Sequence, residues 1–312
     1  MKIIDKIVYL IFILLSVVLS FFPLNLVRRF AVVLGNIIYF FIPIRKKILH
    51  TNLKLCFPKR SEKWRKTVAR KCYVNICIVI FEILYMSFLD EKGIISSVDT
   101  GNLSLIKESI KKDKGLVIAS GHYSNWEYFG AYISNQIPVR ASCIAKTQTN
   151  LYVNKKMNSL RIQFRYEAIE IGVNLREVFE RLQNNEVLMM LIDQSAHPDY
   201  SSYVEFFNVN VSSFSGAAKF ALKFNTELIF AYLKRDNNLK YNFKSFKVDY
   251  SDLKGYSKEN IEILTQRLQK CLEDCIREEP SQWLWFHRRF KNIKSINSDA
   301  AALFDYSDSI YR

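Results

Sequence analysis

The stretch Gly115-Leu-Val-Ile-Ala-Ser-Gly-His122-Tyr-Ser-Asn-Trp-Glu127-Tyr-Phe-Gly130 runs from an apolar segment of strand length into a segment with helical character. The part before Gly121 has the length and unbroken apolarity of a buried strand, and the part after Asn125 is typical of a helix. A strand that leads directly into a helix is a building unit of α/β proteins. The stretch therefore predicts an α/β fold, with His122 and Glu127 on the two sides of a strand-to-helix corner.

This corner is a candidate site for proton transfer. On one straight helix, five residues turn the chain by about 140°, so His122 and Glu127 could not meet, whereas a histidine placed before the helix can fold back on its first turn. A carboxylate that holds one imidazole nitrogen leaves the other nitrogen free to take a proton from a hydroxyl. We therefore expect His122 to be a general base that Glu127 orients. The alternative is an ordinary polar helix start with a surface histidine.

The chain beyond residue 100 alternates strand-like and helix-like segments. The predicted strands are Leu116–Ser120, Val139–Ala145, Val187–Ile192, Leu228–Tyr232 and Tyr241–Val248. The predicted helices are Leu103–Lys112, Trp126–Asn135, Leu151–Phe164, Leu175–Asn184, Ser215–Phe224 and Lys258–Glu278. This order favours a mostly parallel or mixed central sheet covered by helices. We expect one such domain over residues 46–294, and a loosely packed or disordered tail over residues 295–312.

Residues 1–45 are predicted to form a membrane anchor or an interfacial segment. Ile7–Phe22 is an almost unbroken apolar run of sixteen residues, which is short of the about 20 residues that span a bilayer as a straight helix. A spanning helix and a shallow interfacial helix therefore both fit. A cleaved signal peptide is disfavoured, because no small-x-small site follows and a second apolar stretch, Phe30–Ile44, comes next.

The charge of the chain favours an anionic partner. Lys and Arg number 45 against 30 Asp and Glu, which gives a net charge of +15. Basic residues such as Arg28, Arg29 and Arg45 flank the apolar stretches, as expected for contact with anionic headgroups on the cytoplasmic side of a membrane. Nucleic acid is the weaker interpretation, because the basic residues are dispersed and no nucleic-acid-binding motif is present. We expect the inner membrane as the location, with the main domain on its cytoplasmic side.

Cysteine and histidine spacings predict no metal site and no disulfide framework. The six cysteines are expected to be reduced core or surface thiols: Cys56, Cys72, Cys77, Cys143, Cys271 and Cys275. Glu82 is a single carboxylate on an otherwise apolar helical segment, Ile76–Met86. A buried ion pair with an arginine of the core is the favoured interpretation there, ahead of a catalytic role.

Four ordered segments carry a family resemblance. They are Asn52-Leu-Lys-Leu-Cys-Phe-Pro58; Gly121-His122-x4-Glu127; Asp193-Gln194 with Phe206-Phe207 and Gly216-Ala217-Ala218; and Pro280-Ser-Gln-Trp283-Leu-Trp285-Phe-His287-Arg288-Arg289-Phe290-Lys291. Together they resemble the bacterial lipid A biosynthesis acyltransferases, the late acyltransferases of the lauroyl and myristoyl type. One His-x4-Glu spacing arises often by chance, but four ordered elements seldom do.

The resemblance implies a glycerolipid-acyltransferase-like fold and a reaction. An acyl chain would pass from an acyl carrier protein thioester to a hydroxyl of a lipid A precursor, without a bound cofactor. His122 would act as the base in direct transfer. A serine nucleophile, Ser120 or Ser124, is the less favoured route, because Gly-x-Ser-x-Gly is absent. Two other functions stay open: an acyltransferase for another lipid acceptor, such as an aminolipid or glycolipid, and an inactive membrane-bound binding protein, which would not need His122 and Glu127.

Further residues receive roles from the same reasoning. Arg161 is the candidate for stabilising the oxyanion, with a helix-surface arginine as the alternative. Asp193 and Gln194 follow an apolar strand at the edge where open α/β sheets build their sites, so we expect them to line the cleft or brace the loop of His122, or else to cap structure only. Arg288 or Arg289 could contact acceptor phosphates.

The terminal segment also gives a structural prediction, and departures from the family pattern limit what the resemblance implies. Trp283 and Trp285, two residues apart, are typical of a strand that packs one face into the core. Arg165 stands where the family often has glycine, and Asn208 stands where the family has glycine after the Phe-Phe pair. In the stretch that follows, Ser213 and Ser215 supply the hydroxyls in place of threonines. The donor chain length and the acceptor are therefore left open.

Overall fold

A seven-stranded sheet forms the centre of the molecule, in a computed structural model that describes residues 3–170 and 175–296. Its strand order is β1-β9-β8-β2-β5-β3-β4, and every pair of neighbours is parallel except β8 and β9. The strands are β1 (Val98–Asp99), β2 (Leu116–Ser120), β3 (Ala141–Ala145), β4 (Tyr166–Glu170), β5 (Val187–Leu191), β8 (Glu227–Arg235) and β9 (Tyr241–Lys247). The predicted α/β class with a mostly parallel sheet is confirmed. The likeness to glycerolipid acyltransferases stays a prediction.

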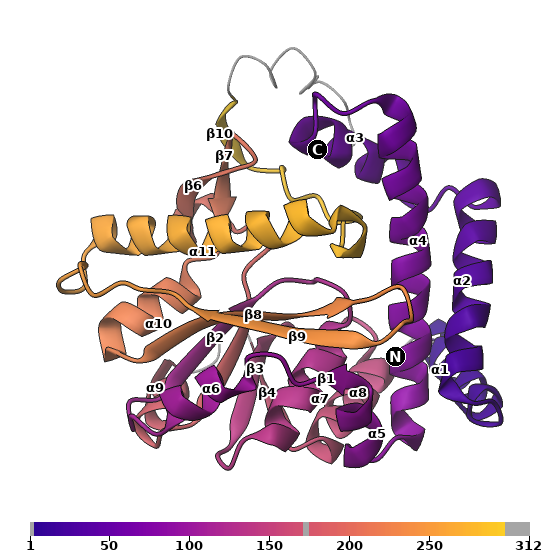
Figure 1. Cartoon of the computed structure of the whole chain (residues 1–312), viewed down its shortest axis with the longest axis horizontal. Helices are drawn as coiled ribbons and strands as arrows, with labels where there is room; N and C mark the ends of the chain where they lie inside the picture. The colour runs from indigo at the N-terminus through magenta and orange to yellow at the C-terminus, as the bar shows by residue number, and fades with distance from the viewer. Residues whose placement is uncertain (1–2, 171–174, 297–312) are drawn as a thin grey trace.

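Helices cover both faces of this sheet (Figure 1). They are α1 (Ile3–Ser20), α2 (Leu24–Phe41), α3 (Lys46–Cys56), α4 (Glu62–Tyr85), α5 (Glu91–Ser96), α6 (Leu103–Ile110), α7 (Trp126–Gln136), α8 (Leu151–Gln163), α9 (Leu175–Gln183), α10 (Gly216–Phe224) and α11 (Lys258–Glu278). Alternate residues of the fully buried strand β2 enter two different apolar clusters. One cluster contains side chains of α3, α9, α10 and α11, and the other contains side chains of α5 to α8. A strand buried on both faces is continuously apolar, which is why Leu116–Ser120 could be predicted.

A second, antiparallel sheet was not predicted. It consists of β6 (Ser202–Phe206), β7 (Val209–Ser213) and β10 (Ile293–Ile296), in the order β10-β7-β6 (Figure 1). Phe207 and Asn208, with φ of 53° and 60°, form the two-residue turn between β6 and β7. Asparagine tolerates this left-handed conformation, so Asn208 can stand where the family has glycine. Strand β10 crosses the predicted boundary at residue 294, and residues 297–312 of the predicted tail lie outside the described residues.

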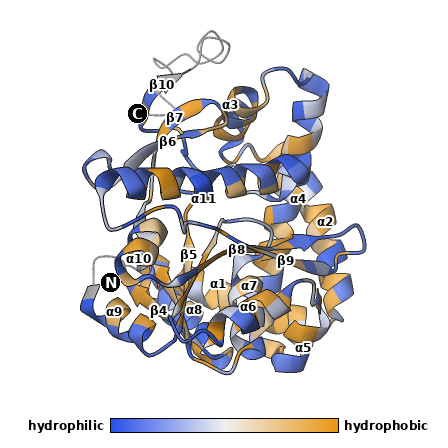
Figure 2. Ribbon diagram, turned by 60° about the vertical axis from the view of Figure 1, so that its left-hand side comes forward, coloured by the Kyte–Doolittle hydropathy of each residue, from blue (hydrophilic) through white to orange (hydrophobic). Residues whose placement is uncertain are grey.

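The N-terminal helices pack on the main domain. Helices α1 and α2 both contact α4, and Figure 2 colours α2 largely as hydrophobic. By length and composition alone, three segments could cross a membrane: Ile3–Ser20, Leu24–Phe41 and Glu62–Phe88. The third was not predicted. Half of the most apolar part of this third segment is buried inside the molecule. Helix α4 therefore belongs both to the group of apolar helices, with α1 and α2, and to the core of the domain. The N-terminal 45 residues are thus not a separate appendage.

Candidate active site

His122 lies at the corner between β2 and α7, as the sequence predicts. Strand β2 ends at Ser120, and Asn125 is the N-cap of α7. The side-chain Oδ1 of Asn125 accepts from the backbone N–H groups of Glu127 and Tyr128 at 3.1 and 3.0 Å, which satisfies two donors that the helix start would leave unpaired. The corner is therefore closed by its own asparagine, and His122 is presented just beyond the carboxyl end of a central strand.

Asp193 is the carboxylate that orients His122. Its Oδ1 lies 2.7 Å from Nδ1 of His122, and its Oδ2 accepts from the backbone N–H of His122 at 2.8 Å. Oδ2 also accepts from Nε1 of Trp283 at 2.8 Å. Strands β2 and β5 are parallel neighbours with Ser120 opposite Leu191, so the residues after their carboxyl ends meet at the same edge. Asp193 thus braces the loop of His122, which is one of the placements expected for it.

The prediction that Glu127 orients His122 is wrong. Glu127 instead receives Nη2 and Nε of Arg161 at 2.7 and 3.1 Å, and the hydroxyl of Tyr166 at 2.9 Å. The spacing of five residues showed that His122 and Glu127 could touch. It gave no information about Asp193, because the position of Asp193 depends on the pairing of β2 with β5. Glu127 is near enough to raise the pKa of His122 through its charge, and its catalytic role stays a prediction.

Asp193 and His122 each shift the pKa of the other toward the charged form. Burial alone would raise the pKa of Asp193, but the charge and hydrogen bonds of His122, together with the indole of Trp283, lower it to about 2. Burial alone would lower the pKa of His122, but the Asp193 carboxylate raises it above its ordinary value. In neutral His122, the Nδ1–H donates to Asp193, and the lone pair therefore lies on Nε2.

The four segments that carry the family resemblance converge on this pair. Asn52 donates from Nδ2 to the carbonyl oxygens of Trp285 and His287 at 2.7 and 2.9 Å. The ring of Phe206 lies 5.7 Å from that of Trp283, and the backbone N–H of Leu284 donates to the carbonyl of His122 at 3.0 Å. The first and last segments are more than 200 residues apart, yet the terminal segment lies directly on the His122 loop.

Comparison with known proteins bears on the family directly. The model of a family described as bacterial lipid A biosynthesis acyltransferase matches residues 2–292. The chain belongs to this family. The match covers the N-terminal helices as well as the domain that holds His122.

Individual lipid A acyltransferases are more distant relatives. Lipid A biosynthesis lauroyltransferase of Escherichia coli (strain K12) is 21% identical over 280 residues, which are 86% of this chain and 86% of that protein. Lipid A biosynthesis palmitoleoyltransferase of the same organism is 22% identical over 256 residues, 80% of each chain. A lipid A biosynthesis acyltransferase of Haemophilus influenzae is 24% identical over 262 residues, 79% of this chain and 78% of that protein.

In this member of the lipid A acyltransferase family, Arg161 is not a helix-surface arginine. Its side chain is buried, and its guanidinium forms the bidentate pair with Glu127 while Nη1 donates to Asn158 at 3.1 Å. Burial alone would lower the pKa of Arg161, but the charge of Glu127 outweighs burial and raises it. The pair holds α7 against α8 beside the corner that contains His122.

Arg161→Met is expected to lower the free energy of unfolding by about 3–5 kcal/mol, because it leaves the carboxylate of Glu127 buried without a countercharge. Denaturant unfolding of the purified variant measures the loss. The matched control is Arg176→Met, because Arg176 pairs with Glu180 at 2.8 Å on the exposed surface of α9. Loss of that exposed pair should cost at most about 1 kcal/mol. Equal losses in the two variants would contradict the structural role of the Glu127–Arg161 pair.

The arginines of the terminal segment have separate places. Arg289 is fully buried, donates from Nη1 to the carbonyl of Ser212 at 2.6 Å, and packs over the ring of Phe206. Phosphate contact by Arg289 is therefore wrong, because no acceptor headgroup can reach a guanidinium enclosed in the core. Arg288 is exposed, so its predicted phosphate contact stays a prediction. Gln194 is half-buried directly after Asp193.

The two tryptophans are buried, as predicted, but not in a strand. Trp283 pairs with Tyr123 through one isolated bridge, and its ring meets that of Trp285 edge to face at 4.6 Å. The bond from Trp283 to Asp193 was missed, because 90 residues separate them and no local spacing indicates it. His287 lies near enough to Asp193 and His122 for their charges to act on it. Burial lowers the pKa of His287 to about 4, so it is neutral near pH 7, and its buried Nδ1 has no hydrogen-bond partner among the residues described.

Ser124 lies within the His122 corner with a strained backbone. It is fully buried, its φ is 52°, and its hydroxyl has no hydrogen-bond partner in the described part of the chain. The left-handed conformation costs a non-glycine residue about 1–2 kcal/mol. Full burial also encloses Ser124 away from a thioester, which disfavours the serine-nucleophile route.

Ser124→Gly is expected to raise the free energy of unfolding by about 0.5–1 kcal/mol, since relief of strain exceeds the entropy cost of glycine. Thermal unfolding measures the gain. Ser124→Ala is the control, because alanine removes the hydroxyl and keeps the strained φ, so it should not show this gain. Retained activity in both variants would exclude Ser124 as a nucleophile, and loss of activity in both would restore that route.

Proposed function

We propose that this protein transfers a fatty acyl chain from an acyl carrier protein thioester to a hydroxyl of a lipid A precursor, with His122 as the general base and Asp193 as the residue that orients it. The hydrogen bond of 2.7 Å between His122 Nδ1 and Asp193 carries the proposal, because it directs the proton-accepting lone pair to Nε2. Family membership supports the reaction class. The names of the relatives, a lauroyltransferase and a palmitoleoyltransferase of lipid A biosynthesis, support a fatty acyl donor and a lipid A acceptor.

The proposed transfer is direct. Nε2 of His122 takes the proton of the acceptor hydroxyl as its oxygen attacks the thioester carbonyl. The tetrahedral intermediate then expels the carrier thiolate as the C–S bond breaks, and the imidazolium returns the proton to that thiolate. The products are an ester and a free thiol, so no bound cofactor or metal is needed in this route.

Arg161 is the proposed source of positive charge for the oxyanion. Three of its five N–H groups are used by Glu127 and Asn158, and this fixes the plane of the guanidinium. A donor held rigidly before the reaction stabilises developing charge without reorganisation. Glu127 would then act through Arg161, which preserves a role for both members of the His-x4-Glu motif.

The membrane is the proposed location. Helices α1 and α2 expose most of their large apolar side chains, among them Ile4, Leu10, Leu14, Val33 and Phe41. Such an outward apolar surface is unfavourable in water and matches the interior of a bilayer. Together with the net charge of +15, it supports an inner-membrane enzyme that attracts an acidic carrier protein and an anionic lipid from the cytoplasmic side.

A transfer assay with the full-length protein tests the function. Lauroyl, myristoyl and palmitoyl thioesters of acyl carrier protein are offered with a lipid A precursor, and the products are weighed by mass spectrometry. The expected product carries one added acyl chain, and it is absent with His122→Ala. A parallel arm offers a glycolipid and an aminolipid, and another replaces the carrier protein with coenzyme A. Transfer only to another lipid would overturn the acceptor, equal use of coenzyme A would overturn the carrier protein, and no transfer to any lipid would overturn the function.

The pH profile is expected to report His122. Since only neutral His122 accepts a proton and its pKa is raised, kcat/KM should fall as pH drops through a value above the ordinary 6.5. Asp193, with a pKa of about 2, stays ionised throughout. Initial rates between about pH 5 and 9 measure the profile. Without the Asp193 carboxylate, in Asp193→Asn, the acid limb of the residual activity should move to lower pH. A wild-type acid limb below 6.5 would contradict this pairing.

A further inference from the structure

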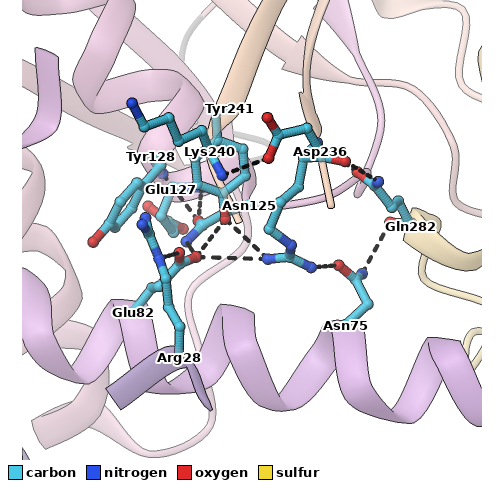
Figure 3. Close-up of polar contacts among 11 residues, drawn as sticks. Arg28, Asn75, Glu82, Asn125, Glu127, Tyr128, Asp236, Lys240, Tyr241 and Gln282 are labelled. Atoms are coloured by element: carbon cyan, nitrogen blue, oxygen red, sulfur yellow. Dashed lines mark hydrogen bonds and ion pairs between the residues drawn. The ribbon is translucent and has the colours of Figure 1, made fainter. Parts of the chain in front are cut away.

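A buried ion-pair network connects helix α2 with the catalytic corner. Glu82 of α4 is fully buried, and its Oε1 accepts from Nε of Arg28 in α2 at 2.6 Å. Its Oε2 accepts from Nδ2 of Asn125 at 2.8 Å and from the hydroxyl of Tyr241 (Figure 3). The predicted buried partner of Glu82 is thus confirmed as Arg28. The sequence did not indicate that the same carboxylate also holds Asn125, three residues after His122.

Asn125 has both ends of its amide committed. Its Oδ1 accepts the first backbone N–H groups of α7, from Glu127 and Tyr128, so its Nδ2 must face Glu82. Glu82 therefore accepts a hydrogen bond in each of these contacts. Its two oxygens connect Arg28 of α2 to Asn125, the N-cap of α7. A shift of the carboxylate would displace the asparagine that closes the catalytic corner.

The network holds the corner at a second point. Nη1 of Arg235 donates to the Tyr241 hydroxyl at 3.0 Å and lies 3.8 Å from Oε2 of Glu82. The backbone N–H and carbonyl of Arg235 bond the side chain of Gln282 at 2.8 and 2.7 Å. The carbonyl of Gln282 in turn accepts the backbone N–H of Ser124 at 2.7 Å. Figure 3 shows Glu82 and Arg28 together near Asn125, and Asn75 farther to the right beside Gln282, whose carbonyl accepts from Nδ2 of Asn75 at 3.1 Å.

The composition of the network favours a positioning role over a stabilising one. Two guanidinium groups and one carboxylate are removed from water here, and buried ion pairs of this kind are often no more stable than apolar residues of similar volume. Helices α2 and α4 already share apolar contacts, including those of Ala31, Val32, Val74 and Ile78. The ion pair adds structural specificity to that packing, because it fixes one arrangement of α2, α4 and the corner.

We propose that Arg28, Glu82 and Asn125 form a relay of positioning residues through which the seating of α2 on α4 sets the geometry of the His122 loop. The inference rests on the proposed acyl transfer, because its effect is read in that reaction. It assigns the apolar N-terminal helices a part in catalysis beyond attachment: the corner reaches its working geometry only with α2 in place.

A double-mutant cycle tests the relay. Arg28→Met removes the charge from α2, and Asn125→Ser keeps a good N-cap while it removes the donor to Glu82. In full-length protein, with a lauroyl carrier-protein thioester and a lipid A precursor, each variant is expected to lower kcat by about tenfold or more and to keep KM for the thioester within about twofold. Because both act through Glu82, the double variant should lose no more than the worse single variant.

Matched variants separate positioning from stability. Lys66→Met breaks an exposed ion pair on α4, the helix that carries Glu82. Nζ of Lys66 lies 2.6 Å from Glu62 in this pair, and the variant should leave kcat unchanged. Arg28→Lys keeps the charge without the planar donor, so it should recover part of the activity. If Arg28→Met does not fold, Arg28→Lys takes its place in the cycle. Rates are divided by the folded fraction from circular dichroism.

The outcomes are distinct. The relay would be overturned if Asn125→Ser and the Arg28 variant keep the wild-type kcat. It would also be overturned if the two losses multiply in the double variant. Neither outcome affects the acyl transfer, which is tested by the wild type and His122→Ala. A lower melting temperature with unchanged kcat would show that the network stabilises the fold only, and would also overturn it. Absence of product from the wild type would overturn the proposed function itself.

Discussion

Replacing His122 with alanine is expected to lower kcat by about 10²–10⁴-fold, which is the range for loss of a general base. Without the imidazole, the acceptor hydroxyl must attack the thioester while still protonated, because its own pKa is far above neutral. KM for the thioester should change little, since Nδ1 of His122 is bonded to Asp193 and, in the proposed route, Nε2 accepts a proton rather than binding the acyl chain. Initial rates with a carrier-protein thioester and a lipid A precursor measure the loss.

The chain offers a matched control for this variant. His197 and Asp199 form a second histidine–aspartate pair, with Nδ1 and Oδ2 3.5 Å apart, and both side chains are largely exposed. His197→Ala should therefore retain wild-type activity. A His122→Ala protein that keeps its activity, while folding as the wild type does, would reject the general-base mechanism.

Asp193→Asn is expected to lower kcat by about 10³–10⁴-fold through the wrong tautomer of His122. Neither orientation of the amide preserves the tautomer that the base needs without leaving buried donors unpaired. If its nitrogen replaces Oδ1, it donates to Nδ1, the proton of His122 moves to Nε2, and the base is lost. If it replaces Oδ2, it faces the N–H groups of His122 and Trp283, both of which are donors. The second orientation leaves buried donors facing one another, so the first orientation, in which His122 has no basic nitrogen facing the substrate, is favoured.

Asp199→Asn is the control for this second prediction, because it makes the same chemical change in the exposed pair and should leave kcat unchanged. Glu127→Gln is the informative comparison. It disturbs the Arg161 pair and removes a charge that raises the pKa of His122, but it leaves the His122–Asp193 bond intact, so the acid limb of its pH profile should move to lower pH by less than in Asp193→Asn. A loss of the acid limb in Glu127→Gln but not in Asp193→Asn would contradict the assignment of Asp193.

The departures from the family pattern have a backbone explanation. Arg165 has φ of 66° and Asn208 has φ of 60°, and both stand where the family has glycine. Glycine adopts such left-handed conformations without steric cost. The two substitutions therefore change the ease with which a turn forms. They supply no evidence for a different donor or acceptor, and chain length and acceptor specificity are questions for the transfer assay.

Segments buried on both faces were predictable, and edge segments were not. Strand β2 and helix α11 have the predicted bounds, because continuous apolarity marks the first and a capping Ser257 with periodic apolar residues marks the second. Strand β4 was missed because it lies at the edge of the sheet, where Glu167 and Glu170 are exposed and remove the apolar signal. Strands β6, β7 and β10 form a small sheet outside the main one. The alternation of polar and apolar residues in Val209–Ser213 is a strand signal, and it was missed.

The sequence by itself determined the α/β class, the strand-to-helix corner that holds His122, the apolar N-terminal segment and the family resemblance, because each depends on residues close together in the chain or on ordered motifs. Only the tertiary structure decided which groups meet at the corner. Asp193 reaches His122 because β2 and β5 are parallel neighbours, and Glu82 reaches Asn125 because α4 brings its carboxylate to the start of α7. Such partners are set by strand pairing and helix packing between distant segments, and spacing along one chain carries no information about them.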